Sequence, residues 1–234
     1  MIGAQLRTRL QKGETITMYT THQTSATFCA RLCELGADTV FLDCEHGTWT
    51  FEDVKISAHA ARGAGGGAIV RPDSHQQSLI IRYLNAGADG IMVPMVNTAA
   101  EAKAVVAAVR YGCQTNYQDR LVIVMIETLE AIDHLDEMLE VEGVDVFFVG
   151  PGDLSQAMGH PAAVPPGGKR APEVVEKVEF ITKKIKAAGK IAGTLVTEDD
   201  VEHWTKAGMQ FLYIHTDPFL RAGIKRIKKI IKVT

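Results

Sequence analysis

The sequence predicts an α/β protein that folds as a single-domain (β/α)8 TIM barrel over residues 1–234. Eight short apolar runs of strand length, rich in β-branched and aromatic residues, alternate with longer segments of helical periodicity. The runs are almost continuously apolar, which is typical of parallel strands buried on both faces. Eight such units in one domain fit a closed barrel better than an open doubly wound sheet.

The eight predicted strands are spaced along the whole chain, with room for a crossover helix between most of them. They occupy residues 15–20, 39–44, 67–72, 89–96, 121–127, 145–150, 191–196 and 211–216. The pattern is weakest at 114–120, a polar segment that precedes the fifth strand. A Pro- and Gly-rich segment, 160–172, is interpreted as a long loop after the sixth strand, because strands continue beyond it.

Several intervening segments carry the signals that begin or end helices. Residues 25–36 and 78–87 each end in a glycine suited to a helix C-cap. Thr98, with Glu101 three residues later, has the capping-box pattern of a helix start. In the segment 221–234 isoleucines recur at helical spacing. We therefore expect a terminal helix whose apolar face docks on the barrel or on a neighbouring subunit.

Composition excludes several classes of protein. The formal net charge of −3 provides no basic field that would attract nucleic acid. No window approaches about 18 uninterrupted apolar residues, and no secretory signal precedes the first strand, so we expect a cytoplasmic protein with no membrane partner. The four cysteines form no C-x-x-C motif, and we expect reduced, partly buried thiols.

Barrel active sites form at the C-terminal ends of the strands, so the residues that end or follow each predicted strand are the candidates for function. Polar residues, glycine and proline gather at most of these ends: Asp43, Glu45 and His46; Arg71 and Pro72; Pro94; Glu127 and Thr128; Gly150, Pro151, Gly152 and Asp153; His215 and Asp217. If the barrel forms, these groups converge on one pocket although they lie far apart in sequence.

Glu127 and Asp153 each follow an apolar strand. Two carboxylates brought together without a cation repel, and one of them then tends to stay protonated. A divalent ion such as Mg²⁺ or Mn²⁺ removes the repulsion and keeps positions free for water and a chelating substrate. The alternative for either acid is a structural role as the N-cap or a first-turn acid of the helix that follows. Backbone N–H groups at Gly152 and Asp153 could also bind a carboxylate or phosphate.

His46 and Arg71 are the other candidates for chemistry. His46 stands next to strand-end acids, and with Asp43 on its far nitrogen it could act as a general base. A structural, hydrogen-bonded histidine is the alternative. Arg71 closes a nearly all-apolar strand and therefore needs an anionic partner. His215, at the end of the eighth strand, is a pocket candidate without an assigned role.

The motifs D-x-E-H (43–46), R-P (71–72), E-T (127–128) and G-P-x-D-L-S (150–155) occur in this order, and together with 84–106 and 187–196 they cover most of residues 12–220. In this combination the chain resembles the HpcH/HpaI family of class II, metal-dependent pyruvate aldolases. The resemblance implies a (β/α)8 barrel that assembles into a hexamer from dimers exchanging the C-terminal helix. It implies cleavage of a 4-hydroxy-2-oxo acid to pyruvate and an aldehyde, through a pyruvate enolate stabilised by Mg²⁺, Mn²⁺ or Co²⁺.

The resemblance also implies roles for individual residues. Glu127 and Asp153 match the metal-binding carboxylates, and Asp153 with Gly152 and Leu195 matches the substrate pocket. His46 matches the catalytic base, Asp43 the acid that orients it, and Arg71 the arginine that contacts pyruvate oxygens. No lysine follows the strands, which agrees with a metal rather than an imine route.

Two departures from the family pattern concern the walls of the site. The segment 111–120 is shorter than usual, and Thr20 and Thr21 stand where the family often has tryptophan. We therefore expect an open acceptor site with poor discrimination between short aldehydes. Decarboxylation of an oxaloacetate-like acid, a CoA-ester lyase of the citrate lyase type, and a non-catalytic oligomeric binding protein on the same scaffold are the competing hypotheses.

Overall fold

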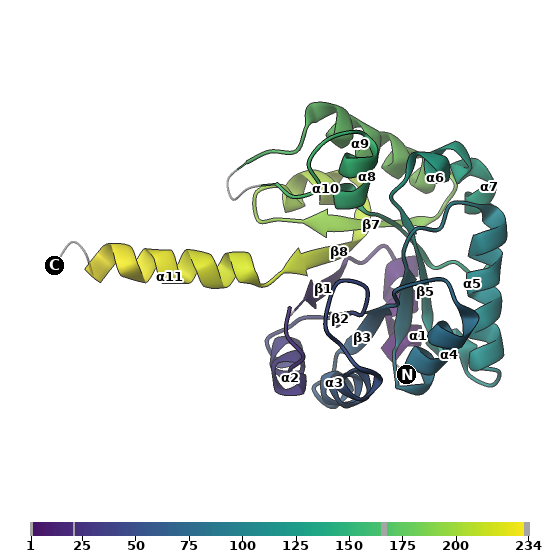
Figure 1. Ribbon diagram of the computed structural model, residues 1–234, viewed down its shortest axis with the longest axis horizontal. Coiled ribbons are helices and arrows are strands. Elements are labelled where there is room, and N and C mark those ends of the chain that lie inside the picture. Colours follow the sequence, from purple (N-terminus) through teal and green to yellow (C-terminus); the bar gives the residue numbers. More distant parts are fainter. Residues whose placement is uncertain (1, 21, 165–167, 232–234) are drawn as a thin grey trace.

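The computed structural model describes residues 2–20, 22–164 and 168–231, and its strands form a closed barrel in the order β1 to β8 (Figure 1). Every neighbouring pair of strands is parallel, including β8 with β1. The strands are β1 (Ile16–Thr20), β2 (Thr39–Asp43), β3 (Gly67–Arg71), β4 (Gly90–Val93), β5 (Leu121–Ile126), β6 (Val146–Val149), β7 (Ile191–Val196) and β8 (Met209–His215). Each falls within or overlaps a predicted run, so the predicted barrel is confirmed.

The helices surround the strands, and most of them cover the outside of the barrel (Figure 1). They are α1 (Ile2–Gln11), α2 (Ala26–Glu34), α3 (Phe51–Gly63), α4 (Gln77–Asn85), α5 (Ala99–Gly112), the 3₁₀ turn η1 (Tyr117–Asp119), α6 (Leu129–Asp133), α7 (Leu135–Leu139), α8 (Pro151–Ala157), α9 (Pro172–Ala187), α10 (Val201–Ala207) and α11 (Asp217–Ile231). The capping box of Thr98 and Glu101 is present at the start of α5. The loop predicted at 160–172 separates α8 from α9, and its residues 165–167 lie outside the described part.

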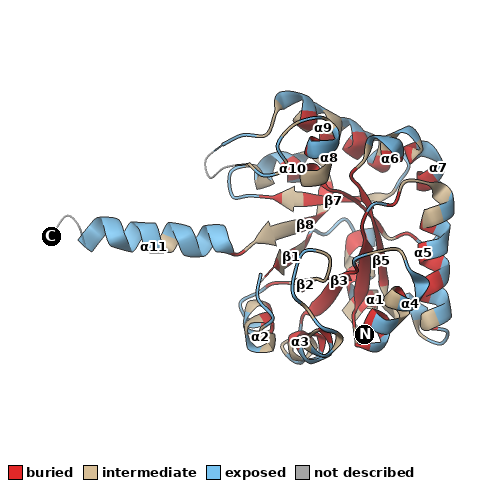
Figure 2. Cartoon of the chain, in the orientation of Figure 1, coloured by how far each residue is buried: buried red, intermediate tan, exposed pale blue. Residues whose placement is uncertain are grey.

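Two apolar layers hold the barrel together, and most of the strands that contribute to them are coloured as buried in Figure 2. One fills the interior of the barrel, and its larger members come from alternate positions of the strands: Ile16, Met18, Phe41, Ile69, Met92, Ile123, Met125, Phe148 and Phe211. The other lies between the outward faces of the strands and the helices. Because side chains alternate along a strand, a strand buried on both faces needs the continuous apolar runs seen in the sequence.

Helix α1, for which the sequence reading makes no prediction, contributes to the interior layer through Leu6 and Leu10. The helix passes so close to neighbouring backbone that a Cβ added at Gly3 would stand 2.1 Å from the carbonyl oxygen of Asp119 and 2.7 Å from that of Asp89. Asp119 and Asp89 precede β5 and β4, so α1 lies at the N-terminal ends of the strands. It closes the end of the barrel that is opposite to the expected active site.

Helix α11 leaves the barrel after β8 and extends away from it (Figure 1). Its apolar side chains Phe219, Leu220, Ile224, Ile227, Ile230 and Ile231 are exposed. Docking of this helix on the barrel of its own chain, one of the two predicted alternatives, is therefore wrong. The other alternative, a neighbouring subunit, stays a prediction.

The four cysteines, Cys29, Cys33, Cys44 and Cys113, are free thiols, and all except the half-buried Cys44 are buried, as predicted. Burial raises the pKa of Cys29, Cys33 and Cys44 to about 11. These thiols are therefore protonated near neutral pH and are poor nucleophiles. In the part of the chain that the structure describes, we find no helix with the length and apolar character needed to cross a membrane.

Candidate active site

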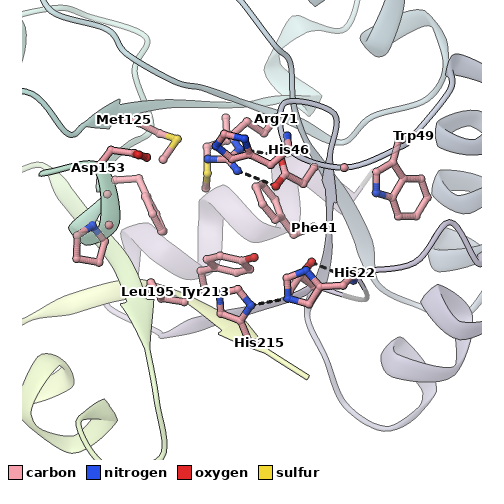
Figure 3. Close-up of a pocket in the computed structure, with 18 of the residues that line it drawn as sticks. His22, Phe41, His46, Trp49, Arg71, Met125, Asp153, Leu195, Tyr213 and His215 are labelled. Atoms are coloured by element: carbon pink, nitrogen blue, oxygen red, sulfur yellow. Dashed lines mark hydrogen bonds and ion pairs between the residues drawn. The ribbon is translucent and has the colours of Figure 1, made fainter. Parts of the chain in front are cut away.

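A cavity of about 370 Å³ opens at the C-terminal ends of the strands (Figure 3). Its lining includes predicted residues from several strand ends: Asp43, His46, Arg71, Gly150, Pro151, Gly152, Asp153 and Leu195. His215, predicted as a pocket candidate, lines it as well. Among the described residues no lysine lines this cavity. These strand-end residues therefore converge as the barrel topology requires. The other predicted strand-end residues do not line the cavity: Glu45, Pro72, Pro94, Glu127, Thr128 and Asp217.

Arg71 is held at the side of the cavity by two carboxylates. Asp43 and Arg71 are paired residues of β2 and β3, which places their side chains next to each other. The guanidinium donates from Nε and Nη2 to the two carboxylate oxygens of Asp43, at 2.8 and 2.7 Å, and Nη1 lies 2.9 Å from Oε2 of Glu45. The predicted anionic partner of Arg71 is confirmed, and it is a pair of acids.

The ion pair sets the charge of these groups. Burial would raise the pKa of Asp43, but the hydrogen bonds and charge of Arg71 outweigh it, and the pKa lies below its ordinary value. For Glu45 burial is the larger effect, and its pKa is raised despite the charge of Arg71. An arginine has five N–H donors, of which three are used here, so two remain for an anionic substrate.

Glu127 directly follows β5 and is buried, with 1% of its surface exposed. Its Oε1 accepts a hydrogen bond of 2.7 Å from the backbone N–H of Met95, a residue held at φ +54°, in the left-handed region. Its Oε2 is buried and has no hydrogen-bond partner. An unpartnered buried carboxylate oxygen is costly, which is typical of a group that waits for a ligand.

Asp153 lies close enough to Glu127 for the two acids to interact. Burial raises the pKa of Glu127 to about 7, and the negative charge of Asp153 acts in the same direction, while the Met95 N–H opposes them. A cation between the two carboxylates would relieve both the burial cost and the repulsion. Within the described residues no cluster of three or more Asp, Glu, His or Cys suits a metal. Two carboxylates therefore fit a hard divalent cation with open coordination positions rather than a closed zinc site.

The structure also decides the capping alternatives for the two acids. Thr128, not Glu127, caps α6, with its side chain accepting from the N–H of Ala131. Helix α8 begins at Pro151 with Gly150 as N-cap, so Asp153 stands inside the first turn and does not cap the helix. Neither carboxylate is an N-cap, but Asp153 is an acid of the first turn of α8, which is the other form of the alternative.

His46 lines the cavity but is not held as predicted. Its side chain is 67% exposed, and its Nε2 lies 3.8 Å from Oε2 of Glu45. The carboxylate of Asp43 accepts instead from the backbone N–H groups of Glu45 and His46, and it binds Arg71. The expectation that Asp43 orients the imidazole ring is therefore not met in this structure, because Arg71 occupies both oxygens of that carboxylate.

The predicted open wall was placed at the wrong end of the barrel. Residues 111–120 precede β5 and therefore lie at the N-terminal ends of the strands, where Arg7 of α1 donates to the carbonyl oxygens of Gln118 and Arg120. Shortening this segment cannot open a site that the loops after the strands enclose. Thr20 lines the cavity, together with His22 and Trp49, and Thr21 lies outside the described residues.

His22, Trp49 and Tyr213 are among the cavity residues that the sequence does not predict as site residues. Tyr213 is an inward-facing residue of β8, and its ring contacts Phe41 and His215 at centroid distances of 4.8 and 4.9 Å. It lies two residues before His215, the end of β8, and therefore on the same face of the strand as that predicted pocket residue. His22 and Trp49 lie in the loops after β1 and β2, where no local pattern distinguishes a lining residue from a solvent-exposed one.

Gly150 should be essential for the acidic pair. A Cβ added there would stand 2.4 Å from Oε2 of Glu127, whereas one added at Gly63, at the end of α3, would meet no atom within 4 Å. We expect Gly150→Ala to weaken Mn²⁺ binding by at least about tenfold, because the methyl group takes the space beside the unpartnered oxygen. Calorimetric titration with Mn²⁺ measures this. Gly63→Ala is the control, and equal affinities in the two variants would contradict the assignment.

Comparison with known proteins adds to this geometry. The profile of the family described as HpcH/HpaI aldolase/citrate lyase matches residues 16–220. A 2-keto-3-deoxy-L-rhamnonate aldolase from Escherichia coli O9:H4 (strain HS) is 30% identical over 244 residues, which cover 94% of this chain and 90% of the relative. The fold matches the crystal structure of citrate synthase SbnG with a TM-score of 0.84 at 26% identity, over 97% of this chain and 98% of that one.

A crystal structure of an HpcH/Hpal aldolase/citrate lyase family protein from Burkholderia cenocepacia J2315 gives a TM-score of 0.87, at 24% identity. The match covers 97% of this chain and 99% of that chain. At this identity the likeness concerns the fold alone. The family match, the relative and the two solved structures each cover most of the chain, which agrees with a single barrel domain.

Proposed function

Because the chain belongs to the HpcH/HpaI aldolase/citrate lyase family, we propose that it cleaves a 4-hydroxy-2-oxo acid to pyruvate and an aldehyde with the help of a divalent cation. The family and the relatives make it an aldolase, a carbon–carbon lyase. The observation that carries the proposal is the unpartnered Oε2 of the buried Glu127 beside Asp153. Two neighbouring acids of which one has an unpartnered buried oxygen support a cation site rather than a purely structural role.

Glu127 and Asp153 would hold the cation. When bound, a divalent cation acts as a Lewis acid that favours the negative charge developing on the 2-oxo oxygen. The two remaining N–H donors of Arg71 would bind the same substrate end, and hydrogen bonds that strengthen as charge develops lower the barrier. Asp43 and Glu45 fix the guanidinium before substrate arrives, so little reorganisation is needed. The backbone at Gly152 and Asp153 and the side chain of Leu195 would complete the pyruvate pocket.

His46 would move the proton at the 4-hydroxyl oxygen as the C–C bond breaks. The ring is the exposed imidazole nearest to Arg71 in Figure 3, and its exposure lets a water molecule relay the proton. Arg71 and the cation held by Glu127 and Asp153 would stabilise the enolate, so His46 would act on the aldehyde half of the substrate. In this scheme Asp43 positions Arg71 rather than the imidazole.

We expect His46→Ala to slow aldol cleavage by roughly 10²–10⁴-fold, the usual contribution of a general acid–base group. Exchange of the pyruvate methyl protons with D₂O, followed by NMR, and oxaloacetate decarboxylation should fall far less, because neither needs proton transfer at an acceptor oxygen. His59→Ala, on the exposed face of α3, is the control. Equal losses in all three reactions would show that His46 acts on the enolate instead.

A panel of 4-hydroxy-2-oxo acids, assayed for pyruvate release with and without EDTA, tests the proposed function. We expect release of one aldehyde for each pyruvate and loss of both with the chelator. Decarboxylation passes through the same enolate, so CO₂ release without an aldehyde would favour the decarboxylase. No turnover of any substrate, with or without added Mg²⁺, would favour a binding protein.

We further propose that α11 packs against a neighbouring subunit in a homo-oligomer. Helix α11 extends away from the barrel of its own chain (Figure 2), and its isoleucines are exposed. A helix with an apolar stripe of this kind needs a second apolar surface to cover it. Light scattering of the native protein tests this, and a monomeric mass at micromolar concentration would contradict it.

A further inference from the structure

Two histidines meet in the wall of the cavity, away from Asp153 (Figure 3). His22 lies in the loop after β1 and His215 ends β8, and 193 residues separate them in sequence. Nε2 of His22 lies 2.6 Å from Nδ1 of His215, and the rings stack with their centroids 4.7 Å apart. The dashed line in Figure 3 marks this contact, and both residues line the cavity.

The contact between the two rings requires an unfavourable backbone conformation at His22. His22 adopts φ +48°, in the left-handed region that non-glycine residues rarely occupy. Thr20 and His215 are paired residues of β1 and β8, and the hydroxyl of Thr216 donates to the carbonyl oxygen of Thr20. The two strand ends are thus fixed to each other, which sets the position of both rings. Unfavourable backbone conformations of this kind concentrate at ligand sites.

A contiguous set of ring contacts joins the pair to the pyruvate end. The guanidinium of Arg71 lies 5.4 Å from the centre of the Phe41 ring, Phe41 contacts Tyr213, and Tyr213 contacts His215. In Figure 3 the rings of Phe41 and Tyr213 lie between Arg71 and the histidines. A substrate whose 2-oxo acid end is at Arg71 and Asp153 would therefore lay its other end along this surface toward His22 and His215.

When both rings are neutral, their hydrogen-bonding capacity selects the kind of group that this end can bind. Each neutral ring carries one N–H and one lone pair. One N–H is used inside the pair, so one outward donor and one outward acceptor remain. A hydroxyl group can both accept and donate, and it satisfies either position. A carboxylate only accepts, so it would leave the outward lone pair without a partner and would be repelled by it.

The surroundings favour the neutral form of His215. Burial lowers its pKa to about 4, and His22 acts in the same direction, whereas the carboxylates of Asp217 and Asp43 oppose the shift. Tyr213, which packs against the ring, also has a raised pKa because of burial and stays protonated. No arginine or lysine stands among the described residues that line this cavity, apart from Arg71 at the other end.

We infer that the His22–His215 pair binds hydroxyl groups of the aldehyde half, so that this chain acts on hydroxylated aldehydes rather than on carboxylate-terminated ones. The inference rests on the proposed function and names the substrate class for it. It also replaces the expectation of an undiscriminating acceptor site. A site built to hydrogen-bond a substrate hydroxyl rejects analogues without it much more strongly than an apolar pocket does.

The test compares kcat/KM for glyceraldehyde, propanal and succinic semialdehyde in condensation with pyruvate and Mg²⁺. We expect the wild type to prefer glyceraldehyde over both other aldehydes by about tenfold or more. His215→Phe keeps the stacked ring and removes both ring nitrogens, and His22→Gly removes the ring while relieving the positive φ. In each variant the preference for glyceraldehyde over propanal should fall to within about threefold of unity. His203→Phe, on the exposed surface of α10, should keep the wild-type ratio.

Exchange of pyruvate methyl protons in D₂O, without any aldehyde, separates the possible failures. If the wild type shows no exchange, the proposed function itself fails. If exchange is present but the wild type prefers succinic semialdehyde, or if neither variant changes the ratio, the inference is wrong and the function stands. Loss of exchange in His215→Phe would also overturn the inference, because the residue would then act on pyruvate.

Discussion

Glu127→Gln is expected to abolish binding of divalent cations and all cation-dependent turnover. The amide keeps the shape of the side chain but removes the charge, and an amide that faces a hard cation is a much weaker ligand than a carboxylate. Asp153→Asn should have the same effect, because the two acids act as one site. Titration calorimetry with Mn²⁺ measures the affinity directly. Glu130→Gln, on the exposed surface three residues further along, is the matched control and should bind like the wild type.

The same substitution should stabilise the cation-free protein. The folded chain holds the Glu127 proton up to a pH of about 7, whereas an unfolded chain loses it near the ordinary value of 4.5. The wild type therefore loses stability as the pH rises from about 5 to 7, and the glutamine variant does not. We expect Glu127→Gln to have the higher unfolding temperature at pH 8 in EDTA, with the difference shrinking toward pH 5. A lower unfolding temperature at pH 8 would mean that Glu127 is a structural residue.

Arg71→Met is expected to remove activity and to lower stability together. The substitution leaves Asp43 and Glu45, whose side chains are only 18% and 21% exposed, without their cation. Removing one partner of a buried ion pair costs about 3–5 kcal/mol, and losing a donor to a developing oxyanion costs roughly 10²–10³ in rate. Urea unfolding and kcat/KM for pyruvate release measure the two effects. Arg31→Met, at an exposed ion pair on α2, should cost at most about 1 kcal/mol.

A double variant separates the two roles of Arg71. Asp43→Asn in the Arg71→Met background removes an unpaired charge, so part of the lost stability should return. Activity should not return, because the donors to the substrate are still missing. If the double variant recovers activity along with stability, Arg71 acts only by keeping the site folded, and its contact with pyruvate is refuted.

Much of the barrel could be predicted from the sequence because each strand is buried on both faces. Such strands leave continuous apolar runs, and the glycines after α2 and α4 mark where helices end. Gly36 and Gly87 both have φ +107°, the conformation that the C-cap signal requires. Helix α1 was not predicted, since its place beneath the barrel depends on contacts with residues far along the chain, such as Asp145 for Arg7.

The sequence predicts which residues form the candidate site better than it predicts which of them bind each other. Topology alone brings strand-end residues together, which is why Arg71, Glu127 and Asp153 were found. Which carboxylate binds which basic side chain depends on the register between neighbouring strands. Because Asp43 and Arg71 are paired across β2 and β3, the carboxylate of Asp43 binds Arg71 instead of the His46 ring. The contact of His22 with His215 joins the two ends of the chain, and no local pattern encodes it.

The expectation that segment 111–120 forms a wall of the site is wrong for a simpler reason. A segment that precedes a strand lies at the N-terminal end of the barrel, so 111–120 could have been assigned to the closed end from strand order alone. Its departure from the family pattern therefore concerns the surface around α1 and η1, where Arg7 holds it. Acceptor selectivity depends instead on loops that follow the strands.

Proton exchange at the methyl group of pyruvate tests the central claim most directly, because it needs the cation site and Arg71 but no aldehyde. The measurement follows loss of the methyl signal by NMR in D₂O, with Mg²⁺ or Mn²⁺ and then with excess EDTA. We predict exchange that depends on the cation, disappears with chelator and is absent in Glu127→Gln. Exchange that persists in EDTA and in this variant would show that the two carboxylates do not hold a catalytic cation.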